Sequence, residues 1–334
     1  TGIGRLKKPK KLITLGVSAV FSIYRIGMSQ IKRYGLRVAA AIVACILWSL
    51  AFVFIKLGLQ FMPPLQFAGL RFFISGLVLI PLVLYYLRRS GETELRGRIF
   101  HALPRLFLLG NLQIGIKYAC FYFGVALLPA ALSALISGTS PLVVALLAHF
   151  VTPDDKLDAR KVVALLLGVF GVLLLTLLRN TVGAVGEWAL LGIVLLILTN
   201  LFTGIGDILV RHQAKQLPSI LIACSSLIVG GAVLLLAGWL VEGVTPLPDS
   251  PRFYGALFAL CTISSGAFAL WFWVLQDSGV KVSRLHVWKF LIPLLGALTA
   301  WLFLPEEHPT LGALLGMSFI VLALFVLFWQ KKKG

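Results

Sequence analysis

Charged side chains are scarce in this chain of 334 residues, of which Asp, Glu, Lys and Arg make up only 13%. A soluble domain carries about 25% charged residues, whereas 59% of this sequence is hydrophobic. This composition excludes an ordinary soluble protein and predicts a polytopic membrane protein. The net charge of +18 comes from basic residues that lie between the apolar runs, as juxtamembrane charges do. We therefore expect no nucleic-acid partner.

Residue patterns that carry chemistry are also missing. The sequence holds no P-loop, no nucleophile elbow and no metal-ligand cluster. We therefore expect neither an enzyme nor an ATP-driven pump, and no catalytic residues, metal or cofactor. No cleavable signal peptide is apparent. The four cysteines lie inside apolar runs without metal-ligand spacing, so we expect them to pack as small hydrophobic residues. They are Cys45, Cys120, Cys224 and Cys261.

Long apolar runs make up most of what remains. A helix needs about 20 apolar residues to cross a bilayer, and ten segments satisfy this requirement. We therefore predict an all-α polytopic membrane protein with ten transmembrane helices. Several links are short and contain proline, which ends a helix, so they indicate helical hairpins. The predicted spans are 36–59, 65–87, 106–127, 130–151, 161–178, 188–209, 219–241, 253–276, 283–304 and 309–329.

One phrase occurs twice in the sequence. PLVVALLAHFVTPDD begins at Pro141, and PLLGALTAWLFLPEE begins at Pro293. Both copies lie in apolar stretches, so we predict two similar halves, at 36–178 and 188–329, followed by a basic tail at 330–334. This arrangement is typical of transporters, in which the interface between repeats opens alternately to either side of the membrane.

Lys and Arg are distributed unevenly between the two sides of this predicted topology. If both termini are cytoplasmic, most basic residues fall inside, including those of Arg88–Arg105, and only Arg179 and Arg252 fall outside. The positive-inside rule favours this orientation and an even number of spans. It places the turn at Pro153 inside and the turn at Pro305 outside. The five-helix repeats are therefore expected to be inverted relative to one another.

The first 35 residues form a separate basic extension. Lys and Arg flank and interrupt an apolar stretch from Leu12 to Ile31, and counting it as an eleventh span would move basic residues to the wrong side. We interpret residues 1–35 as an amphipathic helix in the cytoplasmic interface, with its basic residues on anionic lipid headgroups. A docking helix for a partner protein is the alternative, and the sequence does not distinguish the two.

A set of residues between 36 and 329 matches the motif pattern of a known family. The motifs are Trp48 and Lys56 in the first span, the Pro63–Pro64 turn, Arg71, and the two repeated phrases with their acids Asp154, Asp155, Glu306 and Glu307 and the glycines Gly168, Gly171, Gly312 and Gly316. Together they resemble the EamA-type, ten-helix permeases of the drug/metabolite transporter superfamily. The first turn carries aspartates where that family usually has a glutamate, and span 188–209 lacks a clear second Trp–Lys pair. The resemblance implies the ten-helix fold and transport of a metabolite, without naming the substrate.

Ionisable residues inside the spans are functional candidates, because burying a charge in lipid costs several kcal/mol unless it is paired or hydrated. Lys117 lies near the middle of its span, too deep to reach the surface, and Lys289 lies one turn before Pro293. Basic side chains at such depth favour an anionic substrate group. The predicted substrate-binding residues are Lys117, Gln113, Tyr118, Tyr122, Ser137, Lys289 and Trp271.

Other in-span residues have structural interpretations. Lys56 and Arg71 lie near the outer ends of their spans and can extend to the interface or pair with backbone carbonyls. Asp207 lies four residues before Arg211 and is expected to pair with it. The repeated prolines are expected to kink their helices, and the glycines to allow close packing. No acid or histidine is expected at the bilayer centre, where proton coupling would need one. The predicted structural or gating residues are Pro141, Pro293, Lys56, Arg71 and Asp207.

The sequence therefore predicts a secondary transporter or facilitator that exports a small polar metabolite, with a preference for one carrying a carboxylate or phosphate. We expect an integral, multi-pass protein of a bacterial inner (plasma) membrane with both termini cytoplasmic. A homodimer or a membrane-complex partner is left open. Two alternatives also remain: a non-transporting membrane subunit of a larger complex, and a flippase for a lipid or lipid precursor on the same fold.

Overall fold

The computed structural model describes residues 30–90, 93–128, 133, 136–177, 187–277, 279–303 and 311–328. Within these ranges every regular element is a helix and none is a strand. By its contacts the chain divides into two units, Thr1–Ala39 and Ala40–Gly334. In the smaller unit only residues 30–39, the beginning of the first helix, are described. All other described residues belong to the larger unit.

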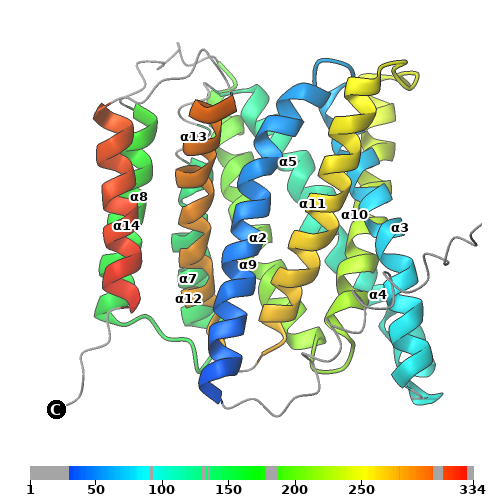
Figure 1. Ribbon diagram of the computed structural model, residues 1–334, viewed down its shortest axis with the longest axis horizontal. Helices are drawn as coiled ribbons and strands as arrows, with labels where there is room; N and C mark the ends of the chain where they lie inside the picture. Colours follow the sequence, from blue (N-terminus) through cyan, green and yellow to red (C-terminus); the bar gives the residue numbers. More distant parts are fainter. Residues whose placement is uncertain are drawn as a thin grey trace, which may run out of the picture. The chain divides into compact units, whose positions relative to one another are not determined.

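Most described helices follow the predicted apolar segments to within a few residues, but the segment predicted to begin at 106 begins at Thr93. Of the segment predicted at 130–151, the described helix covers Ser140–Val151, and residues 130–132, 134 and 135 lie outside the described ranges. Figure 1 shows their long axes running in roughly the same direction. The elements are α2 (Gln30–Gly58), α3 (Pro64–Ser90), α4 (Thr93–Gly110), η1 (Asn111–Gly115), α5 (Ile116–Ala126), α7 (Ser140–Val151), α8 (Ala159–Leu177), α9 (Ala189–Gln213), α10 (Ser219–Glu242), α11 (Pro251–Leu275), α12 (Val282–Val287), η2 (Trp288–Phe290), α13 (Leu291–Phe303) and α14 (Leu311–Phe328).

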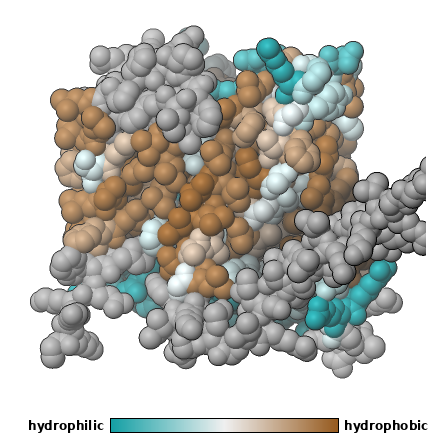
Figure 2. Space-filling model, viewed as in Figure 1, coloured by the Kyte–Doolittle hydropathy of each residue, from teal (hydrophilic) through white to brown (hydrophobic). Residues whose placement is uncertain are grey.

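Large apolar side chains cover the outside of these helices. Phe100, Phe150, Leu240 and Phe258 are all strongly exposed, and Figure 2 shows apolar side chains across the middle of the visible face with polar ones toward its top and bottom. A soluble monomer rarely exposes so continuous an apolar surface. In the described part of the chain, six helices have the length and composition to cross a membrane. The protein is an integral membrane protein, and the count of ten crossings stays a prediction. The six are Gly35–Gly58, Pro64–Ser90, Gly97–Ala126, Ala189–Gln213, Ser219–Glu242 and Pro251–Leu275.

Two close helix pairs each join one helix of the first half to one of the second: α3 packs on α10, and α8 packs on α14 (Figure 1). Glycines allow the backbones to touch. A Cβ atom on Gly69 of α3 would lie 2.4 Å from the backbone nitrogen of Leu235 in α10. One on Gly171 of α8 would lie 2.7 Å from the carbonyl oxygen of Gly316 in α14. Gly171 and Gly316 of the repeated motif thus meet as expected for small residues at a helix interface.

Three interruptions divide the inner helices. A π-helical turn, η1, separates α4 from α5, and a 3₁₀ turn, η2, separates α12 from α13. Thr139 forms a turn just before α7. Pro141 and Pro293 each lie in the first turn of the helix that follows such a break. Proline fits there, because the first-turn N–H groups have no partner within the helix.

Carboxylates at the turn between α7 and α8 link the two halves. The buried Asp155 carboxylate accepts hydrogen bonds from the Lys161 ammonium and the Ser283 backbone N–H, each at 2.8 Å, and from the Ser283 hydroxyl. Asp154 pairs with Arg211 of α9 at 3.2 Å. Burial acts to raise the pKa of Asp155, but the bonds from Lys161 and Ser283 outweigh it and hold that pKa below its usual value.

A second link between the halves joins the last residue of α10, Glu242, to the start of α3. Glu242 accepts hydrogen bonds from the backbone N–H groups of Leu65 and Gln66, at 2.9 and 3.0 Å. A carboxylate at this place satisfies donors that the start of α3 leaves without a helical partner, and it complements the helix dipole. Glu242 is separated from Ser219 by the length of α10, about 36 Å for a helix of 24 residues.

Several predicted features lie outside the described residues. They are most of the N-terminal extension (1–29), the turn at 304–310 that contains Pro305, Glu306 and Glu307, and the basic tail (330–334).

Candidate functional site

Asp207 of α9 is the centre of the most polar group of side chains inside the bundle. Only 1% of this residue is exposed. Its carboxylate accepts hydrogen bonds from the amide nitrogen of Gln113 at 2.7 Å, the indole nitrogen of Trp271 at 2.9 Å and Nε2 of His286 at 2.7 Å. The ammonium of Lys289 lies 3.5 Å from the same carboxylate. We call these five residues the Asp207 cluster.

The π-helical turn η1 brings Gln113 to Asp207. A π turn inserts an extra residue into a helix and so changes the direction of the side chains that follow, and such turns are frequent at functional sites. Gly206, next to Asp207, leaves the necessary space, because a Cβ atom there would lie 2.7 Å from the Gln113 amide nitrogen. The first half therefore contributes the Gln113 side chain to the cluster by means of the π turn η1.

The 3₁₀ turn η2 has the same role in the second half. His286 occupies the last turn of α12, and Lys289 lies in η2 itself. The two residues are three apart and both reach Asp207. His286 is fully buried. Because its Nε2 donates to a carboxylate, its Nδ1 is an acceptor, and this atom has no hydrogen-bond partner among the described residues.

Aromatic rings surround the basic side chains beside the cluster. The Lys289 ammonium lies 4.4 Å from the centre of the Trp271 ring and 5.5 Å from that of Trp48. The Lys117 ammonium lies 4.8 Å from the Tyr118 ring and 5.7 Å from the Phe268 ring. Rings at these distances attract a cation through their negative faces. This interaction stabilises both ammonium groups without neutralising them.

Arg71 adds a third basic side chain, buried at 4% exposure. Its guanidinium carbon lies 4.3 Å above the Phe72 ring, and that ring is 4.7 Å from Tyr118. Nε of Arg71 has no hydrogen-bond partner within the described ranges. The extension to the interface that we expected for Arg71 is therefore wrong. Lys56, in contrast, is exposed in the last turn of α2.

The balance of charge in this region is uneven. Lys117, Lys289 and Arg71 are basic, and Asp207 is the acid that contacts one of them. A buried charge is normally matched by an opposite one. The arrangement is therefore suited to receive an anionic group and to surround it with aromatic surface. Among the described residues, no group of three or more His, Cys, Asp or Glu side chains could hold a metal ion.

The predicted site residues separate into two sets. Gln113, Trp271 and Lys289 belong to the Asp207 cluster, and Lys117 lies beside it. Tyr118 and Tyr122 are half-buried neighbours whose ring centres are 6.5 Å apart. Ser137 is half-buried and makes no hydrogen bond to any of these residues.

Two interpretations of the sequence need correction. Asp207 does not pair with Arg211, because Arg211 reaches Asp154 instead and Asp207 binds the cluster. His286 lies in the interior against that acid, so an acid and a histidine do meet there. The signal was present in the sequence, since a single acid within the apolar spans is a functional candidate by default. His286 and Lys289, three residues apart, are on the same side of their helix.

The helices, the two halves and the buried polar cluster define a membrane transporter built from two repeats. Residues 36–177 and 190–329 each match the EamA-like transporter family. The chain belongs to this family, and both matches together cover most of its length. A solved structure, described only as the crystal structure of a protein, has the same fold with a TM-score of 0.72. It is 19% identical and covers 88% of this chain and 97% of its own.

Relatives of this chain are themselves named as transporters. The uncharacterized transporter YoaV of Bacillus subtilis (strain 168) is 26% identical over 286 residues, which cover 84% of this chain and 92% of the relative. A probable amino-acid metabolite efflux pump of Escherichia coli (strain K12) is 25% identical, with 87% and 95% covered. A probable biotin transporter of Pseudomonas aeruginosa is 29% identical, with 84% and 94% covered. The chain is therefore similar over most of its length to proteins named as transporters, two of them for metabolites.

Proposed function

We propose that this protein exports a small organic anion, with a carboxylate or phosphate group, through alternating access at the interface between its two halves. The substrate's anionic group binds among Lys117, Lys289 and Arg71. Asp207 holds Lys289 and His286 in place and offers a carboxylate to any positive or hydrogen-bonding group on the same substrate. Trp48, Trp271 and Phe268 provide aromatic surface for its apolar part.

The observation that carries this proposal is the surplus of basic side chains over acidic ones around Asp207. A purely structural cluster would be expected to balance its charges, because an unmatched buried charge is costly. The unpartnered Nε–H of Arg71 supports the same conclusion, since buried polar atoms normally have partners. A bound anion would accept a hydrogen bond from this group.

The helix breaks support a transport site at the same place. In transporters with inverted repeats, interrupted helices commonly line a substrate site near the bilayer midplane. Here η1 belongs to the first half and η2 to the second, and both carry side chains that reach Asp207. The site is buried in this conformation, so transport requires that one end of the bundle open at a time.

The relatives support the substrate class and the direction of transport. Amino acids and biotin both carry a carboxylate, and two relatives are named for the export of amino-acid metabolites and for biotin. We extend the word efflux from the first relative to this chain as part of the proposal. The proposal also includes the bacterial inner membrane, both termini in the cytoplasm and membrane lipids around the protein.

Transport in proteoliposomes tests the proposal. Purified protein is reconstituted, and uptake and release are measured for a panel of labelled carboxylates, phosphate esters, amino acids and organic cations. We expect saturable transport of one anionic class. Lys117→Met keeps the length of the side chain and removes its charge, so it should reduce that transport by about 100-fold or more, as the loss of roughly 3 kcal/mol of charge-assisted binding implies. Lys215→Met, at an exposed loop position, is the matched control and should transport normally.

The remaining outcomes separate the alternatives. Normal anion transport by the Lys117→Met variant would remove the site assignment. Transport of organic cations alone would overturn the substrate class. Movement of a fluorescent lipid between leaflets, with no transport of soluble compounds, would indicate the flippase. No transport at all, together with stoichiometric partner chains on purification, would indicate a subunit of a larger complex.

A further inference from the structure

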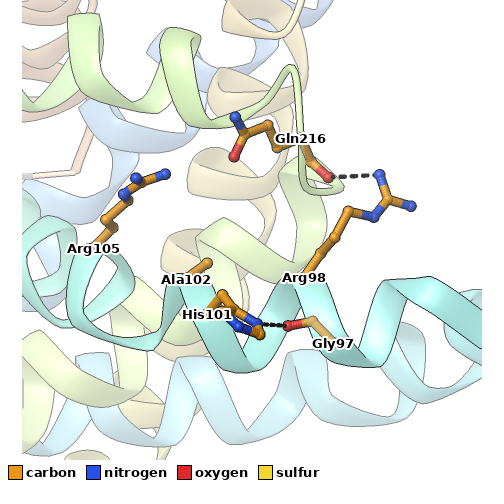
Figure 3. A pocket seen from close by; sticks show the side chains of 6 residues that line it. All are labelled: Gly97, Arg98, His101, Ala102, Arg105 and Gln216. Atoms are coloured by element: carbon orange, nitrogen blue, oxygen red, sulfur yellow. Dashed lines mark hydrogen bonds between the residues drawn. The ribbon is translucent and has the colours of Figure 1, made fainter.

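A basic cleft lies away from the Asp207 cluster, between α4 and the link that joins α9 to α10. Its volume is about 460 Å³, and it is lined by Gly97, Arg98, His101, Ala102, Arg105 and Gln216. A water molecule occupies about 30 Å³ in the liquid, so the cleft has room for a group much larger than one water. Figure 3 shows the side chains of Arg98 and Arg105 on either side of the His101 ring, with Gln216 across from them.

Three basic side chains share one face of α4 at the cleft. Arg98, His101 and Arg105 are spaced i, i+3 and i+7, which places them in a row along the helix. Arg98 donates from Nη1 to the backbone carbonyl of Gln216 at 3.3 Å, which holds its guanidinium at the rim. His101 donates from Nδ1 to the carbonyl of Gly97 at 2.9 Å, so its Nε2 is directed elsewhere. The six residues that line the cleft, all of them described, include no acid.

The other side of α4 carries apolar residues. Phe100, Leu103 and Phe107 are strongly exposed, and they follow at i, i+3 and i+7 on the face opposite the arginines. A helix with a basic face and an exposed apolar face near its beginning is typical of a membrane boundary, where apolar residues contact acyl chains and basic ones contact headgroups. The cleft therefore lies where the phosphate layer of a bilayer meets the protein.

We propose that this cleft binds a phosphate group, which Arg98 and Arg105 contact with their guanidinium groups. The planar guanidinium matches two phosphate oxygens at once, and such charge-assisted hydrogen bonds are about twice as strong as neutral ones. The side-chain amide nitrogen of Gln216 can donate to a remaining oxygen. Basic pockets between transmembrane helices bind anionic lipid headgroups in this way. The same chemistry recognises a soluble phosphate ester, so the test must distinguish the two sources.

Native mass spectrometry of the full-length protein in detergent provides the test. The probes are short-chain phosphatidylglycerol, short-chain phosphatidylcholine, sn-glycerol 3-phosphate and inorganic phosphate. We expect one phosphatidylglycerol to bind more tightly than phosphatidylcholine. The Arg98→Gln/Arg105→Gln variant should weaken this binding by about tenfold or more, because it removes both guanidinium groups that contact the phosphate. Arg88→Gln removes an exposed charge from the end of α3 and should change the affinity by less than about twofold.

A second variant keeps both arginines. Gln216→Glu places a carboxylate in the cleft and should weaken binding to a similar degree, while the melting temperature reports whether either variant is folded. Preference for the lipid over the soluble esters assigns a lipid headgroup, and equal or tighter binding of the soluble esters assigns a soluble phosphate. Equal binding of phosphatidylcholine, or wild-type affinity in both variants, would overturn the proposal.

Discussion

Asp155 and Asp207 are both buried carboxylates, yet their surroundings differ in charge. Asp155 meets one ammonium, that of Lys161, and its other bonds come from the neutral N–H and hydroxyl of Ser283. One negative charge therefore faces one positive charge. The acid also holds the turn after α7 against the start of α12, which is a structural role.

Asp207 has the opposite balance. It contacts Lys289 and His286, while Lys117 lies beside the cluster on aromatic rings rather than on a carboxylate. Burial alone therefore does not distinguish a structural acid from a functional one. What separates them is whether the protein itself neutralises the basic groups around the acid. Four predictions test this comparison.

The largest effect is expected for Asp207→Asn. The substitution keeps the shape of the side chain but leaves the basic residues around it without their acid, and breaking a buried pair costs about 3–5 kcal/mol. We expect transport to be lost and thermal stability to fall strongly, as measured in proteoliposomes and by thermal unfolding in detergent. Asp154→Asn is the control, because that acid forms a solvent-exposed pair worth about 1 kcal/mol or less. A functional Asp207→Asn protein would end the distinction between the two acids.

A smaller and purely structural effect is expected at the other acid. Asp155→Asn leaves Lys161 buried without a counter-charge and should destabilise the fold by roughly 3 kcal/mol. The double variant with Lys161→Met should lose less than the sum of the two single variants, because one change removes the group that the other left unpaired. Unfolding measurements on all four proteins give this coupling. For the folded variants the substrate KM should stay at the wild-type value, and a raised KM would show that Asp155 contributes to the binding site.

Acid should weaken the Asp155 link in the wild type. The pKa of Asp155 in the folded protein lies below its unfolded value of about 3.9. Its contribution to stability is therefore complete above about pH 5 and is lost as the pH falls through 3.9 toward the folded pKa. The difference in melting temperature between wild type and Asp155→Asn, measured from pH 7 to pH 3, should shrink as the pH falls below about 4. A difference in melting temperature that stayed constant at all pH values would show that the Asp155 carboxylate is not the group that titrates.

The smallest effect is expected for Ser283→Ala. It removes one hydroxyl bond to Asp155 but leaves the backbone N–H and Lys161 in place, so the loss should be about 1 kcal/mol. Transport should not change. Trp271→Phe removes one donor from Asp207 in a comparable way, yet it should also impair transport. Equal transport by the Ser283→Ala and Trp271→Phe variants would show that the Asp207 cluster, like the contacts of Asp155, has only a structural role.

The sequence predicted the helices well because their signal is local. An apolar run of about 20 residues is visible without any knowledge of the neighbours. The repeated phrase identified Pro141 and Pro293 as corresponding positions, although they lie in the first turns of α7 and α13 rather than as kinks inside longer helices. The small residues were also informative, since Gly171 does meet Gly316 across α8 and α14.

The partners of Asp207 could not be derived in the same way. They come from η1, α11, α12 and η2. Even the nearest of them in the sequence, Trp271, is 64 positions from Asp207. Which face of a helix meets which neighbour depends on packing across the whole bundle, and the π turn that redirects Gln113 has no clear mark in the sequence. The nearby Arg211 offered a simple local partner for Asp207, so no distant partners were expected. The general rule about lone acids in membranes was the better guide.

The pairing of α3 with α10 has a consequence for how the chain is made. The helix that completes the packing of α3 ends about 150 residues later in the sequence. At the usual rate of synthesis, about 5–20 residues per second, α3 waits roughly 8–30 s for this partner. During that time its glycine-lined seam faces lipid or the insertion machinery, and the N–H groups of Leu65 and Gln66 lack Glu242. The packing of the first half is therefore completed only when α10 of the second half has been made.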